Sequence, residues 1–442
     1  MSDQQTRPAR TPRDLIITMM TVLGFGAGLA ASFDLARITD FPVDMIIYRD
    51  GVRAFLSGDE MYSVPMQAGD LQLPFIYPPF GALVLVPLTV FEWMDDYRAA
   101  TFMILGSSLL ILLCLHLVLR ALLRDVEPRV RLMVTAVTWA FTLLLEPVWL
   151  NASFAQINVV IMALVVLDLV PRKRWLPQGW LIGVAAAIKL SPLAMLLYFL
   201  LRRDFRAIFT AAASFLLMTL AAAAVRWDAT VEFFTTVLLG MGTGSEVGVD
   251  PAYTSNSSLK AMVMRFFDTQ AALDANGTAL NIIWLVLSLS VIGLGGWLML
   301  ALMRRDLHVD AWLVNALIML LISPISWSHH WVWVALLLPV ALWRWAAVLG
   351  RPTFLGVVLM VWGLVMLTDP PKWWFGDGVD VYALSIFEKI LVSDYVWFAL
   401  LTMLGLALAL RKVPVPPKTA ATEDQADQSA PARGPQGPPG SA

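Results

Sequence analysis

The sequence predicts an all-α protein that crosses a membrane many times, and three observations support this fold class. The 442 residues are 59% hydrophobic, with a mean hydropathy of +0.72. Only 14% of them are charged, whereas a soluble domain has about 25%. Apolar runs of about 16 to 24 residues recur along the chain, and each is long enough to cross a bilayer core about 30 Å thick as a helix. An ordinary soluble protein is therefore excluded.

Charge and cysteine content exclude further classes. The net charge of -2 and the pI near 6.1 provide no basic surface for nucleic acid, and no P-loop, helicase or zinc-binding pattern occurs. The single cysteine, Cys114, cannot form an intrachain disulfide. We therefore expect no nucleic-acid partner, and stability must come from packing between helices.

The first predicted span is the apolar run from Leu15 to Phe33. Arg7, Arg10 and Arg13 precede it, as basic residues precede a signal peptide core, but the run is longer than most such cores. We therefore expect residues 1–14 to form a cytoplasmic N-terminus. Residues 15–410 are then one transmembrane domain.

Basic clusters set the orientation of the later spans, because Lys and Arg are retained on the cytoplasmic side. These clusters lie at 7–13, 120–131, 172–174, 202–206, 304–305, 344–351 and 411–412. The connections at 34–98, 227–278 and 369–391 contain more acidic than basic residues, and we expect them to be outer loops. Both termini are then cytoplasmic. Residues 411–442 are rich in Pro, Gly, Ala and Gln, which predicts a disordered cytoplasmic tail.

The segment from Phe75 to Phe91 in the first outer loop is apolar enough to enter the bilayer. If it crossed completely, every later basic cluster would change sides. Its Pro78-Pro79 pair interrupts helical hydrogen bonding, as in re-entrant backbone that protein shields from lipid. We therefore predict a re-entrant or interfacial segment.

A pair of short helices is predicted around Lys189. Only 27 residues separate Arg174 from Arg202, both in cytoplasmic clusters, whereas two full crossings need roughly 40. Ser191-Pro192 breaks the run just after Lys189. A lysine at the bilayer centre costs about 2.5 to 3.5 kcal/mol, so we expect it to face a cavity or an anionic partner. The total becomes about ten full transmembrane helices plus this short pair, twelve helices in all.

The first outer loop contains candidates for acid–base chemistry. A carboxylate near the membrane surface, such as Asp44, could remove a proton from a hydroxyl nucleophile. Asp44 could equally be one of several acids that keep this loop solvated. Asp50, six residues further on, is a competing base. Tyr48 and Tyr77 lie in the same loop.

Three further polar groups are predicted on the outer face. Gln156 and Asn158 follow one span, and the adjacent His329 and His330 follow another. Caps and interfacial aromatic residues would explain them without any function. Neighbouring positions on a helix point in different directions, so the histidines are a poor metal pair, but they could face a phosphate. A second outer loop adds Asn256 and Arg265.

The order of these motifs resembles one family. An early Asp in a long outer loop is followed by Tyr-Pro-Pro-Phe, Gln-Ile-Asn, Lys-Leu-Ser-Pro, Asn-Ser-Ser-Leu and Ser-Pro-Ile-Ser-Trp-Ser-His-His-Trp. Over roughly Asp44 to Trp331, this is similar to glycosyltransferase family 87 of the GT-C superfamily, and within it to the α-1,2-mannosyltransferases of phosphatidylinositol mannoside and lipomannan synthesis. Ala155 departs from the family's usual Gly before Gln-Ile-Asn, and Ser328 stands where an Asp often precedes the histidines.

The resemblance implies a GT-C-type fold in a bacterial plasma membrane, with the active site on the outer (periplasmic) face. The donor would be a polyprenyl-phosphate sugar, usually mannose, and the acceptor a glycolipid of the phosphatidylinositol mannoside or lipomannan type. Asp44 would be the general base of an inverting transfer. The implied donor-phosphate ligands are Lys189, His329, His330 and Arg265, and the implied sugar or acceptor ligands are Tyr48, Asp50, Tyr77, Gln156, Asn158 and Asn256. No metal or other cofactor is required, although some relatives in the superfamily use a divalent ion.

Two alternatives remain open. The donor sugar could be arabinofuranose, because pocket shape decides sugar identity. The intramembrane lysine and the short helix pair would also suit a transporter or flippase of a lipid-linked sugar. An enzyme needs the Asp44 carboxylate but no alternating access, and a flippase needs the reverse.

Overall fold

The computed structural model describes residues 11–38, 41–171, 173, 175–240, 248–349 and 353–415. Within these ranges the chain is mostly helical, and its only sheet is a ribbon of β1 (Met66–Ala68) antiparallel to β2 (Leu71–Leu73). The predictions for residues 1–10 and for residues 416–442 of the tail lie outside the described part of the chain.

The long apolar helices are the candidate membrane spans. They are α1 (Pro12–Ile38), α4 (Asp96–Leu122), α10 (Phe205–Val225), α15 (Gly277–Met303) and α18 (Phe354–Leu367) with its extension η5 (Pro371–Trp373). A sixth span forms if α5 (Pro128–Thr142) and α6 (Glu146–Ser153), which meet at a bend of 63°, are one broken crossing. Other apolar helices are shorter: α7 (Asn158–Leu169), α16 (His308–Ile322), α17 (Val334–Leu349) and α20 (Asp394–Leu410). The count of ten full spans is therefore not confirmed, because polar and proline-containing turns divide several predicted runs.

The interior of the bundle is formed by α16 and α17. Nearly every residue of α16 is buried, including Trp312 and Asn315. By contrast, α1, α10 and α15 leave large apolar side chains exposed, among them Ile16, Phe209 and Leu289. Exposed apolar faces on long helices are suited to contact with lipid tails and not with water. The chain is a multi-pass membrane protein.

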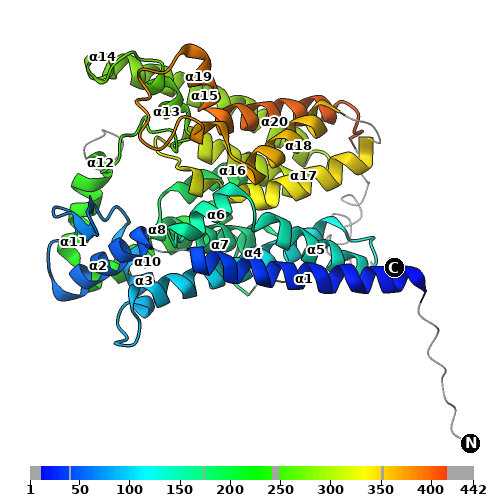
Figure 1. Ribbon diagram of the computed structural model, residues 1–442, viewed down its shortest axis with the longest axis horizontal. Helices are drawn as coiled ribbons and strands as arrows, with labels where there is room; N and C mark the ends of the chain where they lie inside the picture. The colour runs from blue at the N-terminus through cyan, green and yellow to red at the C-terminus, as the bar shows by residue number, and fades with distance from the viewer. Residues whose placement is uncertain are drawn as a thin grey trace, which may run out of the picture.

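The helices from the three predicted outer loops gather at one end of the bundle, on the left of Figure 1. They are α2 (Val43–Ser57), α3 (Pro79–Leu85), α11 (Trp227–Glu232), α12 (Leu238–Gly240), α13 (Leu259–Arg265), α14 (Gln270–Ala275) and α19 (Ile386–Leu391). The start of α1 and the end of α20 lie toward the opposite end (Figure 1). The loops therefore share one end, as the predicted topology requires.

The predicted helix break at Lys189 is confirmed. Helix α8 (Trp180–Ile188) ends just before it, and Lys189 itself is extended, with φ -153° and ψ 130°. The chain resumes as η2 (Ser191–Met195), with Pro192 in its first turn, and continues as α9 (Leu196–Leu201). Proline fits the first turn of a helix but removes a hydrogen bond when it lies inside one, which explains the position of the break.

The apolar segment of the first outer loop is too short to cross. Helix α3 and the turn η1 (Val86–Leu88) together form ten residues, about 15 Å of helix against a core of about 30 Å. A Cβ atom on Gly81 of α3 would lie 3.0 Å from the carbonyl oxygen of Ile188. This close approach places the start of α3 beside the end of α8, and thus Tyr77 near Lys189. Whether the segment dips into the bilayer remains a prediction.

Candidate active site

A hydrogen-bonded network centred on Gln156 joins three separate parts of the chain. The Gln156 Oε1 atom accepts from the Tyr48 hydroxyl at 2.6 Å and from the Tyr77 hydroxyl at 3.1 Å. The two hydroxyls are 2.7 Å apart, and their rings meet edge to face. Gln156 Nε2 donates to Asp44 Oδ2 at 2.5 Å. Helix α2, the segment before α3 and the α6–α7 turn thus converge on one amide.

Local backbone geometry presents these side chains. Asp44 and Tyr48 are four residues apart on α2 and therefore share one helix face. Gln156 follows Ala155, whose φ of 53° puts it in the left-handed region. The Gln156 N–H then donates to the carbonyl of Asn151 at 2.9 Å, and the Asn151 side chain donates back to the Gln156 carbonyl at 3.2 Å. The left-handed conformation explains why glycine suits position 155, since alanine costs about 1 to 2 kcal/mol there.

The network fixes the orientation of the Gln156 amide. Its oxygen already accepts from two hydroxyls, so its NH2 group is the part that faces Asp44. Asp44 Oδ2 is therefore occupied, while Oδ1 has no hydrogen-bond partner in the described ranges. Burial raises the pKa of Asp44 to about 6, and the Gln156 bond and the Lys189 charge oppose that rise. The carboxylate is thus ionised at neutral pH but more basic than an exposed aspartate.

Lys189 forms the cationic side of the same network. Its ammonium group donates to Asn158 Oδ1 at 3.0 Å, contacts His330 Nε2 at 3.0 Å and lies 3.4 Å from the Tyr77 hydroxyl. When Lys189 is charged it has donors only; His330 Nε2 then accepts from it, and the imidazole proton lies on Nδ1. The predicted intramembrane lysine therefore faces polar groups and not lipid.

His329 is buried beside this group with an exposed fraction of 6%. It belongs to the 3-10 turn η4 (Ser328–Trp333), and its carbonyl accepts from Asn158 Nδ2 at 3.3 Å. Its ring packs edge-on against Phe154 and His330. Neither ring nitrogen has a hydrogen-bond partner in the part of the chain that is described. The two ring nitrogens of His329 are therefore available to form hydrogen bonds with a bound molecule.

Arg265 and Asn256 lie outside this network. The Arg265 guanidinium is fully buried and donates to the carbonyls of Ala252, Tyr253 and Asn256 and to Ser393 Oγ. Burial lowers the pKa of Arg265 to about 10, while acidic groups nearby partly oppose that fall. The Asn256 amide is bonded to backbone atoms of Pro251, Pro324 and Ser326. Both side chains hold outer loops together. The structure therefore does not bring Arg265 to the predicted phosphate site or Asn256 to the predicted sugar site.

Asp50 is also apart from the network. It forms an ion pair with Arg53 at 2.5 Å, one turn further along α2, and is partly exposed. Six residues place it on a different helix face from Asp44. The geometry therefore favours Asp44 over Asp50 as the candidate base, because only Asp44 is bonded to the network centred on Gln156.

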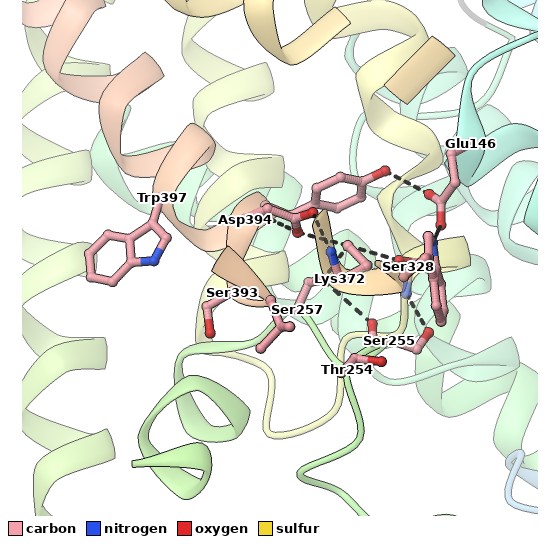
Figure 2. A network of polar contacts seen from close by, with 12 residues as sticks. Glu146, Thr254, Ser255, Ser257, Ser328, Lys372, Ser393, Asp394 and Trp397 are labelled. Carbon is pink, nitrogen blue, oxygen red and sulfur yellow. Dashed lines mark hydrogen bonds and ion pairs between the residues drawn. The ribbon is translucent and has the colours of Figure 1, made fainter. Parts of the chain in front are cut away.

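A second buried network escaped the sequence analysis (Figure 2). Lys372 forms an ion pair with Asp394 at 3.2 Å and donates to Ser257 Oγ at 2.8 Å and Ser328 Oγ at 2.9 Å. The sequence marks Lys372 only as a cation in an acidic outer loop, between Pro370-Pro371 and two tryptophans. Its position just after an apolar run is the only sequence feature that could have indicated a buried lysine. Among the described residues, no group of three or more His, Cys, Asp or Glu could hold a metal ion.

Two mycobacterial proteins are similar over most of their length. Each is a polyprenol-phosphate-mannose-dependent alpha-(1-2)-phosphatidylinositol mannoside mannosyltransferase. The Mycolicibacterium smegmatis protein is 30% identical over 90% of this chain and 89% of its own. The Mycobacterium tuberculosis protein is 31% identical over 88% of this chain and 91% of its own. A phosphatidylinositol pentamannoside mannosyltransferase of M. smegmatis is 30% identical over 82% of each chain.

A solved structure is more distantly similar. ArnT from Cupriavidus metallidurans bound to undecaprenyl phosphate is 16% identical, and the match covers 89% of this chain and 77% of ArnT with a TM-score of 0.39. A likeness that weak carries no argument about the fold. By contrast, residues 75–324, more than half of the chain, match glycosyltransferase family 87. The chain therefore belongs to glycosyltransferase family 87.

Proposed function

We propose that this protein transfers mannose from polyprenol-phosphate-mannose to a phosphatidylinositol mannoside type of glycolipid on the outer face of the membrane. The named activities of its relatives support the donor and the acceptor. The observation that carries the chemistry is the pairing of an ionised carboxylate, Asp44, with the cation Lys189 in one buried network. A hydroxyl nucleophile needs the first, and a phosphate leaving group needs the second.

Asp44 acts as the general base. Its Oδ1 takes the proton of the acceptor hydroxyl while that oxygen forms a bond to C1 of the mannosyl group. The bond between C1 and the phosphate oxygen breaks, and its electron pair leaves with polyprenyl phosphate. Attack from the side opposite the leaving group inverts C1, so a β-linked donor gives an α-linked product, as base-assisted attack does in inverting glycosidases.

The leaving phosphate needs charge stabilisation and no proton, because it is an anion at neutral pH. Lys189 supplies positive charge, and the Nδ1–H of His330 supplies a donor. His329, whose ring nitrogens are unbonded in the described structure, adds a third polar group. Tyr48, Tyr77 and Asn158 belong to the same hydrogen-bonded network as the base and the cation, and their hydroxyl and amide groups can hold sugar hydroxyls. No step requires a metal ion.

The test is transfer of radiolabelled mannose from synthetic polyprenyl-phosphate-mannose to a crude glycolipid extract by purified protein. Asp44→Asn keeps the side-chain shape and an oxygen for Gln156, but it removes the base, so we expect transfer to fall by about 10²- to 10⁴-fold. Asp50→Asn is the matched control on the same helix and should retain transfer. The same assay with polyprenyl-phosphate-arabinose tests the donor sugar.

Each outcome has a distinct meaning. Wild-type transfer by Asp44→Asn would remove Asp44 from the mechanism, and loss in Asp50→Asn alone would make Asp50 the base. Binding of the donor without transfer by any form would instead favour a carrier of lipid-linked sugar. Donor binding by Asp44→Asn, measured separately, shows that the variant is folded.

A further inference from the structure

We propose that Lys372 is a positioning residue that holds the His329–His330 turn in place through Ser328. The inference rests on the proposed function, because it gives that turn the task of binding the donor phosphate. Among the described residues, Lys372 forms no hydrogen bond or ion pair with either histidine, and it acts through Ser328, the residue that precedes them.

The first argument is the burial of an ion pair. Lys372 has no exposed surface, and Asp394 is almost as completely buried. A buried ion pair is weak evidence for stability, because desolvation offsets much of its attraction. The contacts that Lys372 makes are therefore more informative about its role than its contribution to the stability of the fold.

The second argument is that all three hydrogens of the Lys372 ammonium group have an acceptor. Asp394, Ser257 and Ser328 receive its three hydrogens at 3.2, 2.8 and 2.9 Å. Figure 2 shows these partners around Lys372. The ammonium nitrogen also lies over the Tyr395 ring, 3.1 Å from its centre, and the Tyr395 hydroxyl donates to Glu146 at 2.6 Å. The direction of each bond is therefore fixed.

The third argument is the place of the contacts along η4. Ser328 precedes the two histidines and accepts from Lys372, whereas Trp331 follows them and packs against Tyr395 with ring centres 5.5 Å apart. One buried unit thus contacts both flanks of the histidine pair. On the other side, His330 contacts Lys189 at 3.0 Å. A shift of the turn would break that contact, so the unit sets the spacing between histidine and lysine.

The experiment compares Ser328→Ala with Ser257→Ala in the full-length protein. Replacing Lys372 itself would leave the Asp394 charge buried alone and could prevent folding. The two serines are equally buried and each accepts one bond from the same ammonium, but only Ser328 belongs to η4. Thermal stability should therefore fall to a similar extent in both variants.

The expected difference is in donor handling. For Ser328→Ala, we expect kcat/KM for polyprenyl-phosphate-mannose and the affinity for polyprenyl phosphate alone to fall about tenfold, with the acceptor KM unchanged. Ser257→Ala should stay within about twofold of wild type in all three quantities. Equal effects of the two variants, or normal phosphate affinity in Ser328→Ala, would overturn the positioning role. Absence of transfer in the wild type would instead count against the proposed function, and phosphate binding would still test the inference.

Discussion

Replacing Gln156 by leucine should shift the pH dependence of the reaction. Leucine has a similar volume but offers no N–H to Asp44 and no oxygen to Tyr48 and Tyr77. The Gln156 N–H stabilises the ionised form of Asp44 and so lowers its pKa, against the rise caused by burial. Because the base acts only when ionised, loss of this bond must move activity to higher pH.

The size of the shift follows from the bond. A hydrogen bond to a charged group contributes about 1.5 to 3 kcal/mol, and about 1.36 kcal/mol corresponds to one pKa unit. In the wild type, kcat/KM should rise with pH through a midpoint near the pKa of Asp44, about 6. In Gln156→Leu, that midpoint should move up by about one to two pH units. At pH 6 the variant should therefore be about tenfold slower from this effect alone.

The assay is mannosyl transfer at low donor concentration between pH 5 and 9, so that the rate reports kcat/KM. Asn315→Leu is the matched control, because Asn315 is a fully buried amide whose side chain donates to the Ala194 carbonyl, away from Asp44. It should lower thermal stability and leave the midpoint unchanged. A Gln156→Leu profile that keeps the wild-type midpoint would refute the proposed coupling between the amide and the base.

Two further predictions concern charge. Lys189→Met should weaken binding of polyprenyl phosphate by about 10- to 100-fold, because a charge-assisted bond contributes about 1.5 to 3 kcal/mol. Equilibrium binding tests this, and an unchanged affinity would make Lys189 structural. The control is Lys389→Met, because Lys389 is a buried lysine of α19 that donates to the Phe267 carbonyl. Transfer should persist after dialysis against EDTA, because Lys189 and the histidines supply the stabilising groups; loss of activity that Mg²⁺ or Mn²⁺ restores would contradict this.

Patterns along the sequence predicted the features that depend on neighbouring residues. The break after Lys189 followed from Pro192 and from the short distance between basic clusters, and the structure confirms it. The family followed from the order of short motifs, and the comparisons confirm it. Asp44, Tyr77 and Gln156 were named from these motifs, and the structure places them in one network. Their roles in the reaction remain proposals.

The features that escaped prediction depend on contacts between distant segments. Arg265 was assigned to the phosphate because it is a cation in an outer loop, and no local pattern shows that backbone carbonyls surround it. Lys372 and Asp394 were two of many charged loop residues, and only the folded chain brings them together with Ser257 and Ser328. The number of full spans stays a prediction, because hydropathy does not detect a bend such as the one between α5 and α6.

The proposed role of the Lys372–Asp394 ion pair has a consequence for the order in which the site forms during synthesis. Asp44 and Gln156 belong to the first half of the chain. By contrast, Lys372 lies in η5, and Asp394 is the first residue of α20. The growing polypeptide therefore contains the proposed base, Gln156 and both histidines before it contains the ion pair to which we assign the positioning of the turn. A chain that ends before Asp394 would lack this ion pair, so we expect its histidine turn to be less firmly held than in the full-length protein.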